Sequence, residues 1–577
     1  MKKIICGLVV LMVLVSGFFY EKIVEKVDYF IKKEQMQTVS NLIGSEEFQK
    51  LFKTERNIPK TADLGSFLAA HIARDEGDFV KSVPYLKKAY IADKEQKDVR
   101  KQLYFLAGIT GDIPTLMSML QDAKKEKKEF FFSSYLIVAE LIKNEKYEEA
   151  RKFLLSQKNK KRESFEYPLL AWVYAGLKNK ELALKSLEGM EKDAFLENLK
   201  WYHSAMILDY LGYFDEAEVF YKKLSKKTKF SSLSVLVSGK KFYQRQKKWS
   251  FSNEFYITYE TLLKEQPLLF DILKQVDMPE FKTPSDGVAE LFYSWATNTA
   301  NHQELSILIS NIALYLNNEH TLAQIWSAEL FEKMKYYDLA HAIYDDLLKR
   351  SENADIILYK KGLLYAQEEK FDLVVEIFSD LIKRNEYNPL VISTLALAHQ
   401  SLREYDKAAP LFEKSLFLLE KMGVSNAKDV HFQAAVSYLN MGEFAKFEKH
   451  IYRCLQLDEK DAHIMNYLAY SWLERDLNIE EAVAFLETAH ELEPDSPEIM
   501  DSLAFGYYKQ GKYQKALVLS EKAVDLLGAS SVANMHLGDI YKVLGRHREA
   551  KSQYEKALAL KLDLTPEVEK ELLKRLK

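Results

Sequence analysis

The sequence predicts an all-α protein, a solenoid of antiparallel helix pairs arranged in two blocks. Three observations predict it. A pattern of apolar and small residues recurs at intervals of 33–35 residues along most of the 577-residue chain. The chain contains only 20 Gly and 12 Pro, which favours long helices with short turns. Its hydrophobic content of 47% is ample for a core, and 577 residues exceed what one core usually organises.

The first 20 residues have the layout of a secretory signal peptide or an uncleaved membrane anchor. Lys2 and Lys3 precede an apolar run over residues 4–20, close to the shortest length that spans a bilayer. Residues 21–62 follow as an amphipathic helical linker. Whether the first 20 residues are cleaved off or remain as a membrane tether, Lys2 and Lys3 keep the amino terminus on the cytoplasmic side. We therefore expect an exported protein, periplasmic or anchored in the inner membrane facing the periplasm, with secretion as an alternative.

Fourteen repeat units account for residues 63–564. They begin at residues 63, 97, 131, 164, 198, 232, 287, 321, 355, 389, 428, 462, 497 and 531. Residues 266–286 hold three of the chain's 12 prolines and interrupt the series, which predicts a hinge between a first block at 63–265 and a second at 287–564. Residues 565–577 begin with Thr-Pro and have a polar face, which predicts a capping helix for the last pair.

Within each unit, small and larger residues have fixed places. Small residues at the eighth, twentieth and twenty-seventh places let two helices approach, and larger side chains at the eleventh and twenty-fourth places fill the remaining space. In the last two units, these structural residues are Ala504, Tyr507, Ala516 and Ala523, and Gly538, Tyr541, Ala550, Tyr554 and Ala557. Pro494 stands where one pair is expected to end and the next to begin.

This pattern resembles the tetratricopeptide repeat, and the resemblance implies that the helix pairs stack into a right-handed superhelix. The runs NYLAYSW (466–472), DSLAFGY (501–507) and HLGDIY (536–541) are similar to the closing repeats of long exported bacterial members of that family. The resemblance implies a non-enzymatic scaffold that binds peptide segments or helices of partner proteins, often in the cell envelope. The best-known ligand mode of such repeats is a clamp of Lys, Asn and Arg for a terminal carboxylate. The corresponding places here hold Asn466, Tyr470, Glu498, Asp501 and Ser502, so we expect no such clamp.

In stacked pairs the first helices line the concave side, where we expect an aromatic-lined groove for a partner polypeptide. The candidate groove residues are Trp295, Tyr359, Asn466, Tyr470, Asp501, Phe505 and Asp539. Tyr470 and Phe505 hold the ninth place of consecutive units, so their rings are expected side by side. The alternative is that single members of the set only pack against the neighbouring first helix. The set favours a segment with apolar anchors and basic or amide groups over a free carboxylate.

No residue pattern indicates catalysis, a cofactor or a metal site. The run GYYKQGKY (506–513) resembles a phosphate-binding loop but lacks the Ser or Thr that holds Mg²⁺, and Gly511 is the turn glycine of its repeat. His450 and Cys454 stand four apart on a helix, a spacing that can bind metal. Cys454, however, occupies a small-residue place, which favours packing. Cys6 and Cys454 are the two cysteines and provide no disulfide framework.

Charge is distributed unevenly along the chain. Residues 1–250 hold 45 Lys and Arg against 33 Asp and Glu, and the remainder holds 36 against 52. No recognition motif accompanies the basic part, so we expect no nucleic-acid partner. The sequence therefore predicts a non-enzymatic scaffold or adaptor of the bacterial cell envelope. The alternatives are a secreted effector acting on host proteins, a cytoplasm-facing assembly factor and an enzyme. The pattern specifies neither the partner nor the oligomeric state.

Overall fold

The computed structural model describes residues 63–75, 78–125, 133–156, 165–190, 194–225, 233–248, 281–350, 355–384, 386–527, 530–560 and 566–576. The expected signal peptide or anchor (1–20), the linker (21–62) and residues 266–280 of the expected hinge lie outside these residues. No helix in the described part is long and apolar enough to cross a membrane.

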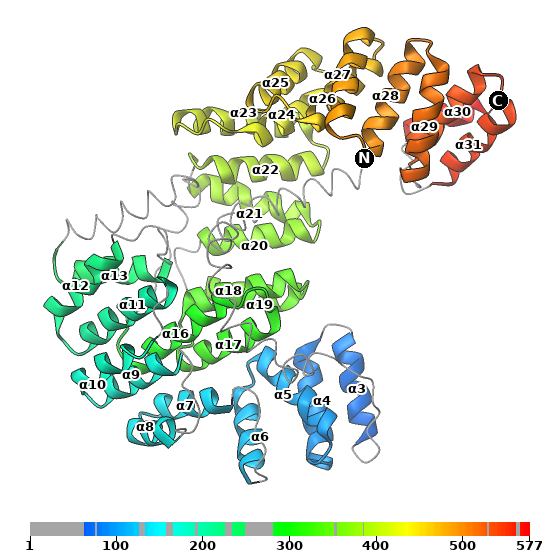
Figure 1. The fold of residues 1–577 in the computed structure, drawn as a ribbon. Helices are drawn as coiled ribbons and strands as arrows, with labels where there is room; N and C mark the ends of the chain where they lie inside the picture. The colour runs from blue at the N-terminus through cyan, green and yellow to red at the C-terminus, as the bar shows by residue number, and fades with distance from the viewer. Residues whose placement is uncertain are drawn as a thin grey trace. The chain divides into compact units, whose positions relative to one another are not determined.

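The described residues form 28 helices (Figure 1). Before the expected hinge they are α3 (Leu64–Asp75), α4 (Phe79–Ala92), α5 (Lys97–Thr110), α6 (Ile113–Lys125), α7 (Ser133–Lys143), α8 (Tyr147–Ser156), α9 (Glu166–Gly176), α10 (Lys180–Leu187), α11 (Ala194–Tyr210), α12 (Phe214–Ser225) and α13 (Leu233–Arg245). After it they are α16 (Pro284–Asn298), α17 (Gln303–Leu316), α18 (Thr321–Lys333), α19 (Tyr337–Arg350), α20 (Asp355–Gln367), α21 (Phe371–Arg384), α22 (Pro389–Ser401), α23 (Tyr405–Lys421), α24 (Lys428–Asn440), α25 (Phe444–Leu457), α26 (Ala462–Leu473), α27 (Ile479–Leu492), α28 (Pro497–Lys509), α29 (Tyr513–Leu527), α30 (Ser531–Val543), α31 (His547–Ala559) and α32 (Pro566–Arg575).

Local side-chain chemistry explains where these helices begin and end. The Asp461 side chain accepts from the backbone N–H of Ile464 at 3.0 Å, and the Ser530 hydroxyl accepts from that of Ala533 at 3.2 Å, which caps the first turns of α26 and α30. Gly511, with φ of 74°, makes the turn from α28 to α29, where a left-handed backbone suits glycine. The all-α solenoid of antiparallel pairs is confirmed, and every first helix begins within four residues of its predicted start.

The helices form two compact units, which divide between Leu364 and Tyr365, within α20. The division does not fall at the expected hinge over residues 266–286. Helices on both sides of that stretch belong to the N-terminal unit, because α16 and α17 pack against α5, α7, α9 and α11. The compact units thus divide within α20, and the blocks at 63–265 and 287–564 stay an expectation from the sequence.

In the N-terminal unit, α16 and α17 cover the first helices of earlier pairs (Figure 1). Gly287 permits the closest approach, since a Cβ atom there would lie 2.1 Å from the ring of the fully buried Trp172. On α17, Asn311 Nδ2 donates to the carbonyl oxygens of Gly108 and Ile109, both at 2.8 Å. These bonds join residues 203 and 202 positions apart, so the chain folds back on its own beginning.

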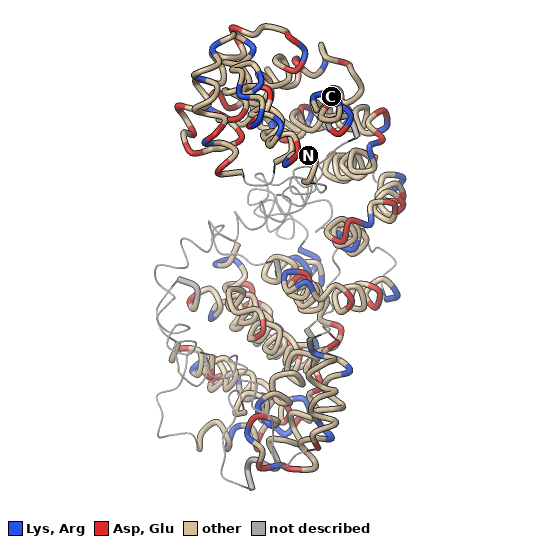
Figure 2. The backbone as a smooth tube through the Cα atoms, turned by 90° about the vertical axis from the view of Figure 1, so that its right-hand side faces the viewer, with Lys and Arg blue, Asp and Glu red and all other residues tan. Residues whose placement is uncertain are grey.

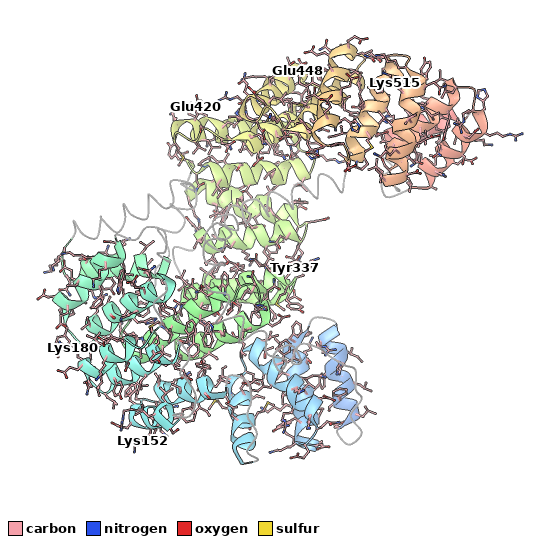
Figure 3. All side chains as sticks on the ribbon, viewed as in Figure 1. Lys152, Lys180, Tyr337, Glu420, Glu448 and Lys515 are labelled. Atoms are coloured by element: carbon pink, nitrogen blue, oxygen red, sulfur yellow. The ribbon has the colours of Figure 1, made fainter. Side chains whose placement is uncertain are left out.

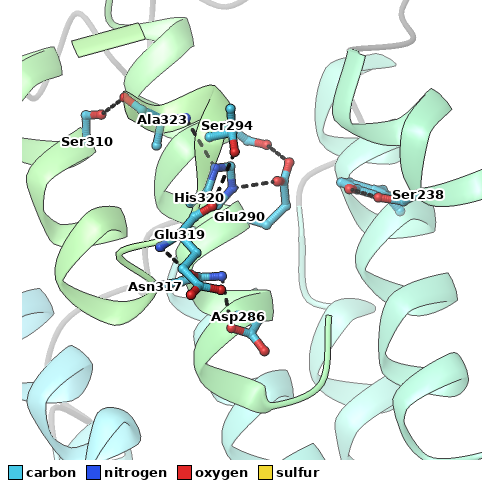
Figure 4. A network of polar contacts seen from close by, with 11 residues as sticks. Ser238, Asp286, Glu290, Ser294, Ser310, Asn317, Glu319, His320 and Ala323 are labelled. Atoms are coloured by element: carbon cyan, nitrogen blue, oxygen red, sulfur yellow. Dashed lines mark hydrogen bonds and ion pairs between the residues drawn. The ribbon is translucent and has the colours of Figure 1, made fainter. Parts of the chain in front are cut away.

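A buried polar network fixes α16 against α18 in the same unit (Figure 4). His320 Nδ1 accepts from the backbone N–H of Ala323 at 3.2 Å, which leaves Nε2 as the donor to Glu290 Oε2 at 3.0 Å. Glu290 is 0% and His320 1% exposed. Because an unpaired buried carboxylate is costly, this pairing ties the position of α16 to that of α18.

The C-terminal unit is a continuous stack of pairs from α21 to α31, and α32 packs against α30 and α31 (Figure 1). Leu572 of α32 is fully buried and contacts the core around Leu537. A helix in this position closes the last apolar face of a solenoid. The second helices carry charged side chains, such as Glu420 on α23, Glu448 on α25 and Lys515 on α29 (Figure 3).

Candidate functional site

Two of the expected groove residues, Trp295 and Tyr359, are core residues of the N-terminal unit. Trp295 is 3% exposed, and its ring centroid lies 4.5 Å from that of Phe165 and 5.0 Å from that of Tyr135. Tyr359, on α20, is also 3% exposed. Their expected place on a partner-binding surface is therefore corrected. The physical reason at Trp295 is the fold-back of α16, which brings this side chain against α7 and the start of α9.

Four rings form one group on the first helices α26, α28 and α30, and we call Tyr470, Phe505, Tyr508 and His536 the inner aromatic cluster. The ring centroid of Phe505 lies 6.0 Å from that of Tyr470, 6.3 Å from that of Tyr508 and 4.3 Å from that of His536. The Phe505 and His536 rings are nearly parallel, with an angle of 10° between their planes. The three phenyl-type rings are partly exposed, whereas His536 is buried. Tyr470 and Phe505 thus lie side by side, as their repeat places predict.

A carboxylate faces the buried member of the cluster. Asp501 Oδ2 lies 3.0 Å from His536 Nδ1, which donates to it. Burial lowers the pKa of His536, but Asp501, with smaller contributions from Asp539 and Glu474, outweighs burial and raises this pKa above its usual value. The pair is therefore favoured in its charged form. Sequence reasoning missed His536, although an acid and a histidine one repeat apart were visible in the sequence.

Two buried acceptor oxygens beside the cluster have no donor within the described part of the chain. They are Oδ1 of Asp501, a residue that is 7% exposed, and Oδ1 of Asn466. Both residues hold the fifth place of their units, on the neighbouring helices α26 and α28. A buried acceptor without a partner costs free energy. A ligand that supplies N–H groups at this position would recover that cost.

Asp539, also expected in the groove, is bound by the chain itself. Arg575 Nε, on α32, donates to its two carboxylate oxygens at 2.7 and 3.1 Å. The hydroxyl of Tyr554 donates to Oδ1 at 2.7 Å. Asp539 thus anchors the capping helix, and its expected role as a partner contact is corrected. The repeat place alone could not reveal this, because the donor comes from a helix outside the repeat.

The predicted structural residues are buried where the helices of the last pairs meet. Ala504, Ala516, Ala523 and Ala557 are 0% exposed, Ala550 and Tyr554 2%, Tyr541 7% and Tyr507 9%. A Cβ atom on Gly538 would lie 2.4 Å from the ring of Tyr554, so only glycine fits there without displacement. Pro494 is exposed in the turn between α27 and α28.

The eleventh-place tyrosines also link consecutive pairs through a recurring hydrogen bond. Each donates its hydroxyl to a glutamate on the second helix of the preceding pair. The three bonds are Tyr507 to Glu487 at 2.7 Å, Tyr541 to Glu521 at 2.6 Å and Tyr438 to Glu413 at 3.2 Å. The glutamate lies 20 residues upstream in two cases and 25 in the third, which follows from the five-residue insertion in the unit at 389. This interval is a signal that sequence reasoning did not use.

The other candidates for chemistry are packed within the fold. Cys454 is fully buried, and burial raises the pKa of its thiol to about 12, so the sulfur is a protonated packing group. His450 faces Glu413 and His431 instead, with Nε2 at 3.1 Å from Glu413 Oε1 and Nδ1 at 3.0 Å from His431 Nδ1. Among the described residues, no three or more His, Cys, Asp or Glu are arranged to hold a metal ion.

Comparisons with known proteins found one family match and several similar solved structures. Residues 532–563, which include α31, match the family model described as tetratricopeptide repeat. No curated protein sequence matches the chain significantly. Similar solved structures include Cut9–Hcn1, an APC/C hetero-tetramer (13% identity, 89% of this chain and 96% of that chain covered, TM-score 0.36). Others are a tetratricopeptide repeat protein from Parabacteroides merdae (17% identity, 44% and 98% covered, TM-score 0.38) and YrrB, a TPR protein with an unusual peptide-binding site (17% identity, 33% and 94% covered, TM-score 0.26).

The family match lies in the last unit, whose residue places recur in the units before it. Its first helix, α30, begins at the predicted unit start, as do the first helices of the five preceding units. The matched residues show that the last unit is similar to a tetratricopeptide repeat, and the same residue places recur in the stacked helix pairs before it.

Proposed function

We propose that this protein is a non-enzymatic scaffold of the bacterial cell envelope that holds partner polypeptides against the inner aromatic cluster. One observation carries the proposal: Tyr470, Phe505 and Tyr508 are partly exposed on consecutive first helices, beside two buried acceptors. Aromatic side chains held rigidly at a surface are the usual anchors of protein interfaces. Stacking between neighbouring pairs supplies that rigidity, because each pair is held by the next.

Loss of partner capture on removal of two rings tests this function. Full-length protein carrying Tyr470→Ala and Phe505→Ala is used as bait in intact envelopes, beside the unmodified protein. Well-buried aromatic anchors contribute about 2 kcal/mol or more each, so we expect capture to be lost. The matched control is Phe417→Ala with Tyr452→Ala, which removes rings 53% and 40% exposed on the second helices α23 and α25.

Three outcomes contradict the proposal. If the cluster variant loses the helical content or melting transition of the last pairs, the rings serve packing and not binding. If it keeps its fold and still captures every partner, the partner surface lies elsewhere. Equal losses from the cluster variant and the control variant would also reject a specific surface.

The envelope location rests on the first 20 residues and has a separate test. A phosphatase that needs an oxidising compartment is fused after Pro59, and a reporter that works only in the cytosol is fused at the same point. We expect the phosphatase to be active and the cytosolic reporter to be silent. The reverse pattern would favour a cytoplasm-facing assembly factor. The mass of the mature chain then shows whether the first 20 residues are cleaved off or remain as a membrane tether.

A further inference from the structure

Three of the four rings of the inner aromatic cluster, Tyr470, Phe505 and Tyr508, belong to an acidic stretch of the sequence. Residues 461–508, which span α26, α27 and most of α28, contain eleven Asp or Glu and a single Arg. Figure 2 marks the acidic and basic residues along the backbone. Glu474 and Glu498 are exposed at the end of α26 and the start of α28, and Asp501 is buried at the cluster. Such an excess of one sign attracts cationic segments and repels carboxylates and phosphates.

The same first helices already bind two cationic groups of the chain. Lys509 Nζ, which donates to Asp476 Oδ1 at 2.5 Å, lies 5.1 Å from the ring centroid of Phe505. The Arg575 guanidinium binds the carboxylate of Asp539, on α30. These contacts are the two standard ways to hold a cation, against an aromatic ring and against a carboxylate. One and two units earlier, the Oδ1 atoms of Asp501 and Asn466 are buried acceptors for which the described residues supply no donor.

We propose that the partner segment presents an arginine or lysine side chain to the inner aromatic cluster, with its N–H groups on Oδ1 of Asp501 and of Asn466. The inference rests on the proposed function and specifies which polypeptide segment the cluster holds. His536 occupies Oδ2 of Asp501, so Oδ1 is the oxygen left for the partner. The aliphatic stem of the cationic side chain packs on the rings of Tyr470 and Phe505. A terminal carboxylate is rejected by the same acidic groups.

Binding of defined peptides to the full-length protein tests the inference. A short fluorescent peptide of alternating leucine and arginine is compared with the same peptide carrying citrulline, which keeps the shape of arginine without its charge. Fluorescence anisotropy should give a dissociation constant about ten-fold lower for the arginine peptide. The difference should shrink as salt is raised, because screening weakens charge attraction. Equal affinity for the two peptides would overturn the inference, as would tighter binding of a glutamate version.

A matched pair of variants separates a specific contact from general charge attraction. Asp501→Asn and Asp495→Asn each remove one charge from the same acidic stretch, but Asp495 is exposed in the turn before α28. We expect Asp501→Asn to weaken the arginine peptide about ten-fold and the citrulline peptide little. Asp495→Asn should change neither. If the two variants weaken binding of the arginine peptide equally, the attraction is a general charge effect, and the specific contact with Asp501 is rejected.

The outcomes also separate this inference from the proposed function. Because Asp501 pairs with His536, the melting transition of Asp501→Asn is measured alongside binding. If Asp501→Asn is destabilised, the inference is tested only by comparing the affinities of the arginine and citrulline peptides for the unmodified protein. If the aromatic variant loses its envelope partner but arginine has no advantage, the proposed function stands and the cationic inference fails.

Discussion

The ninth place of the repeat is buried in the N-terminal compact unit and partly exposed in the C-terminal compact unit. Trp295 and Phe505 both hold the ninth place of a first helix. Trp295 is 3% exposed and stacks on Phe165, whereas Phe505 is partly exposed beside Tyr470. The difference arises because α16 and α17 pack on the first helices of earlier pairs in the N-terminal unit. A repeat place therefore sets the direction of a side chain, and long-range packing decides whether that side is covered.

The largest effect should follow from disturbing the fold-back. Gly287→Val places a side chain where even a Cβ atom would lie 2.1 Å from the ring of the fully buried Trp172. We expect a loss of about 3 kcal/mol in the free energy of unfolding of the N-terminal unit, from overpacking. Hydrogen exchange should quicken in α9 and α16 and not in α28 and α30. Gly65→Ala is the control, since its Cβ atom meets only Asp63 Oδ1 at 3.5 Å. Unchanged exchange in α9 and α16 would show that the fold-back does not depend on this contact.

A smaller and more local effect is expected at the other end of the chain. Ala550 is 2% exposed in the core that holds Tyr554 and Leu572, so Ala550→Leu should separate α30, α31 and α32. Overpacking should cost about 1–3 kcal/mol. The exposed Ala559→Leu, also on α31, is the control. Because each helix pair is stabilised only by its neighbours, protection from hydrogen exchange should fall only at the carboxyl end of the chain. Uniform loosening along the chain would contradict a stack held by neighbour contacts.

Mild acid should have the smallest effect on stability, and the effect should have opposite signs around His203 and His536. Burial lowers the pKa of His203 from 6.5 to about 3, and its Nδ1 accepts from Trp172 Nε1 at 3.0 Å. The unfolded chain therefore binds a proton that the folded chain does not, and stability around α9 and α11 falls as pH decreases below 6.5. The pKa of His536 is raised, so its contribution is complete below 6.5 and is lost as pH rises through the folded value.

Hydrogen exchange at two pH values, corrected for intrinsic rates, measures this contrast. Acidification from pH 7 towards pH 5 should loosen α9 and α11 relative to α28 and α30. His203→Gln keeps an acceptor for Trp172 and should remove the effect in α9 and α11. The comparison excludes α24 and α25, where burial also lowers the pKa values of His431 and His450. Equal responses in both places would show that these histidines do not control local stability.

The helices were predictable from the sequence because helix periods and turn residues act locally. Pro494 and Gly511 lie in turns, and the first helices begin where the repeat places require. The fold-back was not predictable in the same way. Gly287 and Trp172 meet although 115 residues separate them, and a repeat pattern treats every unit alike. The proline-rich interruption predicts a boundary between blocks, whereas the helices on both sides of it pack within one unit.

The candidate site was predictable where it depends on equivalent places in consecutive units. That equivalence brought Tyr470 and Phe505 together as expected. Asp539 holds the same ninth place as these two rings, but it binds Arg575 of the capping helix. The repeat pattern does not predict this contact, because the capping helix lies outside the repeats. His536 was missed because it holds the sixth place, which is usually internal, and its partner Asp501 lies one repeat earlier.

We propose that the inner side of the C-terminal unit accepts a partner, whereas that of the N-terminal unit is covered by its own helices. A photo-crosslinking phenylalanine derivative, placed at position 505 in one protein and at position 295 in another, tests it in intact envelopes. The account predicts crosslinks to partner polypeptides from position 505. From position 295 it predicts crosslinks within the chain only, to α7 or the residues around Phe165. Partner crosslinks from position 295, or equal yields from the two positions, would contradict the account.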